Sequence, residues 1–222
     1  MKIRELTLYT ARIQAQKDFY KNLLGLKILS ENDSGFSVQL KNSVLKFISN
    51  KACSPYHFAF TIPTNKISES LIWLKERLEI IKDGENEIVD FPNWNAQSIY
   101  FYDADKNILE FIVRNNLKNA TRGDFNAGDI LEISEIGLAT EDFEGKLHLL
   151  TSISGIEKFS GGNEVFAAIG TERGLFILID KNRKDWFPSN DKAYASAFSA
   201  KIETAVNLYK VEFKNENLIV RI

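Results

Sequence analysis

Apolar residues alternate with polar ones from Ile3 to Tyr9, and this period of two predicts a β-strand. A helical spacing of apolar residues follows over Ala15–Leu24. Gly25 is placed to end that helix because glycine readily takes a positive φ. Three short strands are predicted next, separated by Asn-Asp-Ser-Gly and Lys-Asn-Ser turns, at Leu26–Ser30, Phe36–Leu40 and Val44–Ser49. This order of elements is a βαβββ module.

The same pattern returns later in the chain, as expected of a repeat architecture. Residues 3–50 align with residues 133–180 at a constant offset of 130 and without a gap. The identical positions fall in predicted strands, turns and core: Ile3, Glu5, Leu8, Thr10, Gly25, Ser30, Phe36 and Leu45 match Ile133, Glu135, Leu138, Thr140, Gly155, Ser160, Phe166 and Leu175. Residues 133–180 are therefore predicted to form another βαβββ module.

Two further modules complete the predicted chain. The second contains a strand, a helix and a hairpin, predicted at His57–Ile62, Ile67–Ile80, Ser98–Tyr102 and Ile108–Val113. The fourth is shorter, with strands at Ala193–Ala200, Leu208–Phe213 and Leu218–Ile222 and a helix near Glu203. The polar stretch Arg114–Asp129 is the candidate linker. We therefore expect two paired-module domains, residues 1–113 and 132–222, joined by residues 114–131.

Composition narrows the class of protein. The chain has 222 residues, 44% of them hydrophobic and 26% charged, as in ordinary globular domains. A formal net charge of −2 gives no electrostatic reason to expect nucleic acid or an anionic membrane as a partner. No apolar run approaches the roughly 20 residues that span a bilayer. Cys53 is the single cysteine and the N-terminus lacks a signal-peptide pattern, so a reducing, cytoplasmic location is expected.

Three segments resemble the vicinal oxygen chelate superfamily of glyoxalases, bleomycin-resistance proteins and extradiol dioxygenases. They are ELTLYT with DFYKNLLGLKI, then YHFAFTIP, and finally FYDADKNILEFI, in which Ala104 and Lys106 replace the usual proline and glycine of the closing hairpin. The resemblance implies an α+β fold of tandem βαβββ modules, in which two modules form one curved mixed sheet, a cup. It also implies a divalent metal on the inner face of that cup.

Metal ligands in this superfamily come from the first and last strands of each module, which the resemblance carries to Glu5, Lys46, His57 and Glu110. Protonated Lys46 cannot ligate, which leaves Glu5, His57 and Glu110 as the implied ligands, with Mn, Ni, Zn or Fe as candidate ions. Strand alternation places these three side chains opposite the helix-facing residues. Glu110 lies in a strongly apolar strand and needs a cation or a donor. A salt bridge to Lys46 is the alternative to metal.

Glu135 matches Glu5, but the positions in the fourth module that match His57 and Glu110 are about Ala195 and Val220. No second triad is therefore expected, and the second domain is interpreted as structural, dimerising or a cover. His148 falls within the helix predicted for the third module, where a surface or packing role is expected.

Several functions remain open at this point, all with a small molecule as substrate or ligand. A glyoxalase-, lyase- or isomerase-like enzyme would use a metal as Lewis acid, with Glu5 or Glu110 moving a proton. A dioxygenase-like enzyme is suggested by the four-module layout. A metal-free binding protein of the bleomycin-resistance type would instead use a pocket lined by Phe36, Trp94, Tyr100 and Tyr102, and Lys46 is a further candidate pocket residue. The sequence leaves open whether the chain forms a homodimer.

Ring cleavage provides one test of these alternatives. The resemblance to extradiol dioxygenases implies an iron site with two histidines and one carboxylate, and a further catalytic histidine beside it. This chain contains two histidines in all. We therefore expect no ring opening of catechol, even with added Fe(II). Rapid, iron-dependent formation of a yellow ring-opened product, followed by absorbance, would contradict this expectation.

Overall fold

The computed structural model of the chain describes residues 1–222, apart from the side chains at positions 162 and 163. The first module consists of β1 (Lys2–Thr10), α1 (Ile13–Asp18), the π-helical turn η1 (Phe19–Leu23), β2 (Lys27–Asn32), β3 (Gly35–Gln39) and β4 (Val44–Ser49). The second consists of β5 (His57–Thr61), α2 (Ile67–Lys75), β6 (Ile80–Ile81), β7 (Val89–Phe91), the 3-10 turn η2 (Pro92–Trp94), β8 (Ala96–Tyr102) and β9 (Ile108–Arg114).

A 3-10 turn, η3 (Ala127–Asp129), precedes the second half of the chain. The third module consists of β10 (Glu132–Thr140), α3 (Phe143–Thr151), β11 (Lys158–Asn163), β12 (Phe166–Thr171) and β13 (Gly174–Asp180). The fourth consists of β14 (Phe198–Glu203), β15 (Leu208–Lys214) and β16 (Asn217–Arg221). The predicted α+β class with tandem modules and curved mixed sheets is confirmed.

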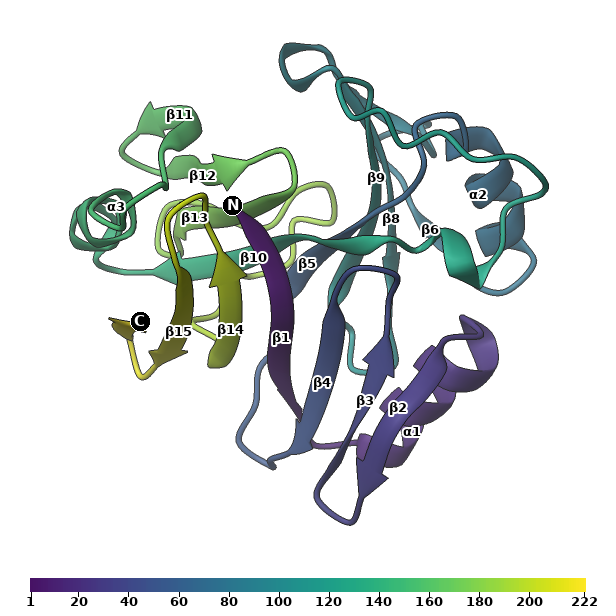
Figure 1. Cartoon of the computed structure of the whole chain (residues 1–222), viewed down its shortest axis with the longest axis horizontal. Helices are drawn as coiled ribbons and strands as arrows, with labels where there is room; N and C mark the ends of the chain where they lie inside the picture. Colours follow the sequence, from purple (N-terminus) through teal and green to yellow (C-terminus); the bar gives the residue numbers. More distant parts are fainter.

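The second module pairs with the third, and the first with the fourth (Figure 1). Strand β5 runs antiparallel to β10 and parallel to β9, and β10 runs parallel to β13. These strands build a curved sheet that we call the central cup (residues 57–114 and 132–180). Strand β1 runs antiparallel to β14 and parallel to β4, which builds the terminal cup (residues 2–49 and 198–221).

This pairing differs from the predicted division into residues 1–113 and 132–222. Thr61 of the predicted first domain lies opposite Glu132 of the second, and Leu6 lies opposite Ala200. Each cup therefore takes one module from each half of the chain. The reason is that β5 and β1 offer their free edges to β10 and β14, so the backbone hydrogen bonds of these strands are satisfied across the two halves.

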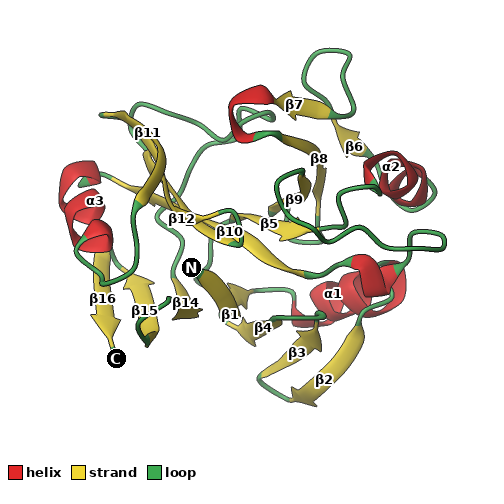
Figure 2. Ribbon diagram, turned by 45° about the horizontal axis from the view of Figure 1, so that its top comes forward, coloured by secondary structure: helices red, strands yellow, loops and turns green.

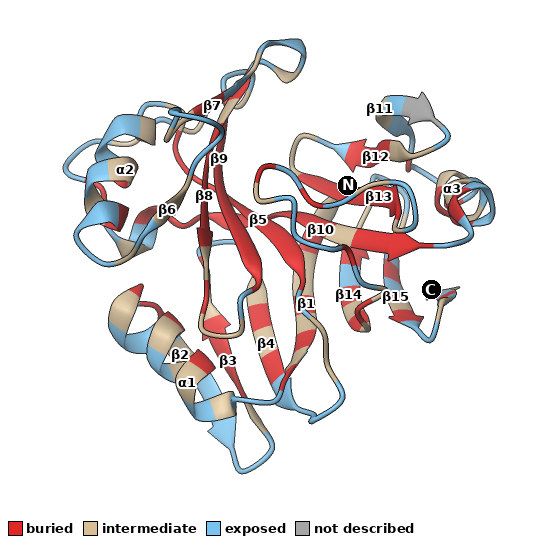
Figure 3. Ribbon diagram, turned by 180° about the vertical axis from the view of Figure 1, so that it is seen from behind, coloured by how far each residue is buried: buried red, intermediate tan, exposed pale blue. Residues whose placement is uncertain are grey.

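The two cups differ in how their strands are buried. Every residue of β5, β9 and β13 is buried, whereas β1 and β15 alternate between buried and more accessible positions (Figure 3). Phe58, Phe60 and Ile62 lie in the main core, as their alternation predicts. The helices pack on the strands of their own modules, α1 on β3 and β4, α2 on β8, and α3 on β12 and β13 (Figure 2). Because β5, β9 and β13 are buried along their whole length, both faces of these strands are covered.

Some predicted elements need correction. Residues near Glu203 form no helix, because Glu203 ends β14 and the following turn is closed by Thr204, whose hydroxyl accepts the backbone N–H groups of Val206 and Asn207. The second helix ends at Lys75, since Ile80 is taken into strand pairing with β8. Gly25 has the expected positive φ, +69°. Among the described residues, no helix combines the length and apolar character that crossing a bilayer requires.

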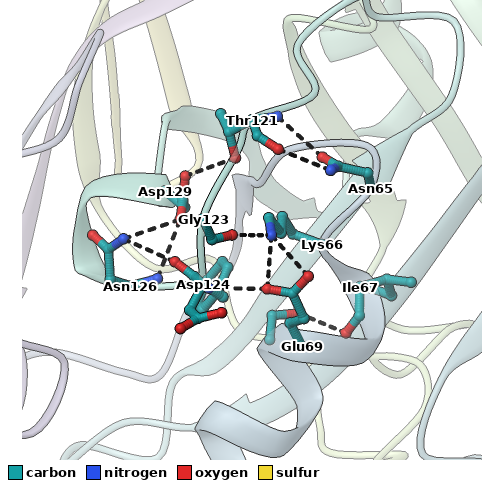
Figure 4. Close-up of polar contacts among 11 residues, drawn as sticks. Asn65, Lys66, Ile67, Glu69, Thr121, Gly123, Asp124, Asn126 and Asp129 are labelled. Atoms are coloured by element: carbon teal, nitrogen blue, oxygen red, sulfur yellow. Dashed lines mark hydrogen bonds and ion pairs between the residues drawn. The ribbon is translucent and has the colours of Figure 1, made fainter.

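The predicted linker is held against the second module rather than lying free (Figure 4). Lys66, which is 4% exposed, donates to both carboxylate oxygens of Glu69 and to the carbonyl oxygen of Gly123. Glu69 also accepts the backbone N–H of Phe125 at 3.0 Å. Asn65 and Thr121 exchange two further hydrogen bonds. Residues 119–129 are therefore fixed at the start of α2.

We expect Lys66→Met to make this segment several-fold more sensitive to trypsin, which cuts after exposed residues such as Lys118 and Arg122. The substitution removes the donor that joins Glu69 to Gly123. The fragments should nevertheless stay associated on gel filtration, because both cups draw strands from both halves. Lys75→Met, which removes an exposed ion pair with Glu87, is the matched control and should leave the rate unchanged. Separation of the fragments after a single cut would contradict the pairing of the modules.

Candidate metal centre in the central cup

Three ionisable side chains converge on the concave face of the central cup. They are His57 of β5, Glu110 of β9 and Glu135 of β10, all buried, with one ligand atom of each within 4.8 Å of the others. The strand register explains the convergence. Ala59 lies beside Glu110 in the parallel pair and opposite Glu135 in the antiparallel pair. The two carboxylates therefore flank a small side chain, and His57 follows on the same face two residues away.

The imidazole of His57 is oriented by its neighbours. Its Nδ1 lies 3.3 Å from the carbonyl oxygen of Ile108, which favours the tautomer with the proton on Nδ1. That leaves the Nε2 lone pair free on the side of Glu110, whose Oε2 is 3.6 Å away. The ring packs on Trp186 with centroids 5.1 Å apart. Burial lowers the pKa of His57 to about 4, so the ring is neutral at pH 7.

The two carboxylates are in different surroundings. Burial, and then the charge of Glu135, raises the pKa of Glu110 to about 8, although Ser98 donates a hydrogen bond to its Oε1 at 2.5 Å. Burial also raises the pKa of Glu135, and the guanidinium of Arg114, bonded to its Oε1, opposes that shift. The two carboxylates thus share one fixed counter-charge, that of Arg114, and without a cation Glu110 is neutralised by a proton near pH 7. A divalent ion could take the place of that proton.

The cluster opens onto a cavity of about 400 Å³. Its lining is largely aromatic and apolar: Phe91, Pro92, Trp94, Tyr100, Phe166, Ile177, Ile179, Trp186 and Phe187, with Asp90, Asn93 and Lys184 as polar members. Trp186 reaches His57 because Gly137 leaves room for it. A Cβ at position 137 would lie 2.6 Å from Cη2 of Trp186. The shape of the cavity therefore depends on a glycine in β10.

A divalent cation fits these residues. A neutral imidazole nitrogen and two carboxylate oxygens are a donor set that Mn, Ni, Zn and Fe all accept. The ligand atoms lie within 4.8 Å of one another, and small side-chain adjustments would let them share one ion, since two ligands at the usual distance of about 2.0–2.3 Å are at most about 4.6 Å apart. The surplus of negative charge in an apolar cup gives the ion an electrostatic role as well.

The structure does not bring Glu5 to this cluster, in contrast to the predicted triad of Glu5, His57 and Glu110. Glu5 lies in the terminal cup, with its Oε2 2.6 Å from Nζ of Lys46 and its Oε1 3.4 Å from Nζ of Lys201. The predicted salt bridge of Lys46 with Glu110 is likewise absent from the described ion pairs, since Lys46 is bonded to Glu5. The physical reason for both differences is that β1 pairs with β14 and not with β5.

The predicted pocket residues are also divided. Tyr100 lines the cavity of the central cup. Tyr102 faces a neighbouring hollow and donates a hydrogen bond to Asp191 at 2.6 Å. Phe36 packs on Phe47 in the core, with centroids 5.3 Å apart. His148 is exposed on α3, as expected.

Sequence reasoning missed the functional place of Glu135, Arg114 and Trp186. The repeat matches Glu135 to Glu5, but the predicted triad takes all three of its residues from the first half of the chain. Arg114 was assigned to the start of a linker, although it is the last residue of β9 and is fully buried. Trp186 lies in an irregular connection that carries no periodic signal.

Comparison with known proteins supports the fold and the family. No family model matches the sequence. Metallothiol transferase FosB from Staphylococcus epidermidis is 31% identical over 116 residues, which cover 49% of this chain and 80% of that protein. FosB from Staphylococcus haemolyticus is 30% identical over the same length.

Among solved structures, a Bacillus subtilis protein proposed to be a dioxygenase superposes with a TM-score of 0.61 at 16% identity. The match covers 81% of this chain and 63% of that one, so the chain spans less than two thirds of that protein. This likeness concerns the fold alone. With paired βαβββ modules, and with relatives at 30–31% identity matched over most of their own length, the chain belongs to the vicinal oxygen chelate superfamily.

Proposed function

We propose that this protein is a divalent-metal-dependent enzyme that acts on a small molecule with two neighbouring oxygen atoms. The convergence of His57, Glu110 and Glu135 in the central cup carries the proposal. The name of the relative FosB, a metallothiol transferase, is consistent with metal-dependent chemistry on a small molecule. The reaction types that we place first are those of lyases and isomerases, with dioxygenase-like chemistry as the alternative.

His57 through Nε2, and Glu110 and Glu135 through one oxygen each, would hold the ion, and Mn, Ni, Zn or Fe all suit this donor set. When bound, the ion would act as a Lewis acid that polarises the two oxygens of the substrate. The protein's own groups supply the remaining functions. Ile108 fixes the tautomer of His57, and Ser98 holds one oxygen of Glu110.

Glu110 is the residue that we assign to proton transfer. In the metal-free site burial, and then the charge of Glu135, raises the pKa of Glu110 to about 8, so the carboxyl readily holds a proton there. A bound divalent ion would lower that pKa, so Glu110 would accept a proton from its ionised, ligating form. The aromatic lining keeps bulk water away from the cluster, which strengthens electrostatic interactions inside the cavity. Lys184 is a cationic member of the lining and can pair with an anionic part of the substrate. The sequence suggested Glu5 or Glu110 for proton transfer, and Glu5 lies in the terminal cup, bonded to Lys46.

Metal content gives the first test. The purified protein should carry a stoichiometric divalent ion, and chelation should lower its melting temperature, because ligands that bind only the folded state stabilise it. Glu135→Gln and Glu110→Gln should each weaken Mn²⁺ binding by more than roughly a hundredfold, since loss of an outer partner alone costs about 10–100-fold. Elemental analysis and Mn²⁺ titration measure both effects.

The matched control is Glu5→Gln, which changes the repeat-related glutamate of the terminal cup and should keep the metal. Loss of metal in this variant, with retention in Glu135→Gln, would contradict the assignment to the central cup. A wild-type protein indifferent to Mn, Ni, Zn and Fe would favour metal-free binding of the bleomycin-resistance type instead.

Stability against pH gives the second test, on protein freed of metal. The pKa of Glu110 is about 8 in the folded state against 4.5 ordinarily, so its contribution to stability falls as pH rises from 4.5 to 8. His57, with a pKa of about 4 against 6.5, acts in the opposite direction, but only below pH 6.5.

Above pH 6.5 His57 no longer contributes, and Glu110 should dominate the pH dependence. The free energy of unfolding should therefore fall between pH 6.5 and 8, by at most about 1.4 kcal/mol per pH unit for one proton. Urea denaturation at several pH values measures the slope. Glu110→Gln should flatten it, whereas Glu5→Gln should not. Parallel profiles for the wild type and Glu110→Gln would show that Glu110 does not titrate in this range.

A further inference from the structure

Arg114 is a buried charged residue of the central cup whose presence the metal ligands alone do not explain. It is fully buried at the end of β9, and its Nη2 is bonded to Oε1 of Glu135. Its guanidinium lies over the rings of Trp94 and Phe159, at 5.4 and 6.0 Å from their centroids. Ser134 accepts from its Nε at 3.5 Å. This is a close, largely aromatic enclosure for a charged side chain.

Fold stability is a poor explanation for such a residue. Buried ion pairs are often no more stabilising than apolar side chains of similar size, because both charges lose their hydration. In addition, Nη1 of Arg114 has no hydrogen-bond partner within the part of the chain whose side chains are described. A buried donor left without a partner is destabilising, because it has lost its bonds to water and gained none in return. The position of Arg114 therefore points to a role in the chemistry of the site.

The charges of the site indicate what that role is. With His57 neutral, the carboxylates of Glu110 and Glu135 together cancel the charge of a divalent ion. A centre without net charge in an apolar cavity attracts an anionic oxygen poorly. The guanidinium of Arg114 adds one positive charge at Glu135 and restores a net charge of +1. Its bond to Oε1 also leaves the other oxygen of Glu135 free for the ion.

We propose that Arg114 is a positioning residue that returns a positive charge to the metal centre, so that the site favours a ligand carrying one negative charge on its chelating oxygens. This inference rests on the proposed metal function and adds the charge class of the ligand to it. The ligand either arrives as an anion or acquires its charge when a proton is removed. Either way, the centre plus one negative charge is neutral, which an apolar cavity tolerates best.

The test compares two substitutions, Arg114→Met and Arg114→Lys, which both remove the planar guanidinium group. Lysine keeps the charge, so the difference between the variants reports charge and not geometry. Arg114→Met should bind Mn²⁺ at least roughly tenfold more tightly than Arg114→Lys, because a nearby positive charge repels the cation. It should bind acetohydroxamate, a bidentate monoanion, at least roughly tenfold more weakly when loaded with Mn²⁺. Calorimetry measures both constants.

The proposal predicts that loss of the charge changes the two affinities in opposite directions. If Arg114 were merely structural, its loss would weaken the binding of Mn²⁺ and of acetohydroxamate together, and that result would overturn the proposal. Equal binding constants for Arg114→Met and Arg114→Lys would also overturn it. Wild-type protein that binds no Mn²⁺ would instead overturn the metal function itself, and this inference with it. Mn²⁺ should also raise the melting temperature of Arg114→Met more than that of the wild type, since the carboxylates then have no other counter-charge.

A double variant keeps the proposal testable if Arg114→Met does not fold. Glu135→His with Arg114→Met replaces an anionic ligand by a neutral one and removes the compensating charge, so the net charge with a divalent ion stays at +1. We expect its Mn²⁺-loaded form to bind acetohydroxamate within about threefold of the wild type, as expected when two substitutions compensate. Affinity as low as in Arg114→Met, or tenfold lower than in the wild type, would overturn the charge argument.

Discussion

Two carboxylates, an imidazole and a guanidinium are enclosed by apolar strands in the central cup, and the remainder of the site depends on how these charges are balanced. Glu110 and Glu135 flank Ala59 and raise each other's need for a counter-charge. Burying unpaired carboxylates costs several kcal/mol each in practice. Strand β5 lies between β9 and β10 and so brings Glu110 and Arg114 of β9 to the same place as Glu135 of β10. The contact of β5 with β10 is thus the pairing on which the site depends.

In the terminal cup the corresponding glutamate, Glu5, obtains its counter-charge from lysine side chains. Glu5 and Glu135 occupy matching repeat positions, but the strand that follows carries Lys46 beside Thr7 in one cup and Ile177 beside Gly137 in the other. Lys46 and Lys201 satisfy Glu5 in a partly exposed ion pair, which leaves no deficit for a cation to fill. In the central cup an apolar isoleucine stands where that lysine would be, so Glu135 keeps its charge available. Glu5 is thus paired with two lysines at a partly exposed place, whereas Glu135 is buried and paired with Arg114 alone.

Local pattern predicted most elements, because alternation and turn residues are properties of short segments, as Ile3–Tyr9 and Gly25 illustrate. The pairing of modules is non-local, and the assumption that neighbours in sequence share a cup placed Glu5 in the site and left out Glu135. A usable signal was nevertheless present. HFAFTI, ILEFIV and GLFILI are apolar on both faces, as strands buried on both sides must be, whereas RELTLY and YKVEFK alternate. Strands that are apolar on both faces are expected to lie side by side in the same sheet. Nothing local indicated that Arg114, next to a polar stretch, is buried.

The shortened fourth module also has a consequence for the site. It has no helix, and the connection that leads to it, residues 181–197, supplies Lys184, Trp186 and Phe187 to the lining of the central cavity. This connection is held in place by its own contacts, since Trp186 and Asp191 pair through their backbones and Tyr102 donates to Asp191. Trp186 lines both the central cavity and the neighbouring hollow, so it forms the wall between them. The half of the chain that carries the weaker repeat therefore provides a glutamate and much of the cover of the site, and neither half can form that site alone.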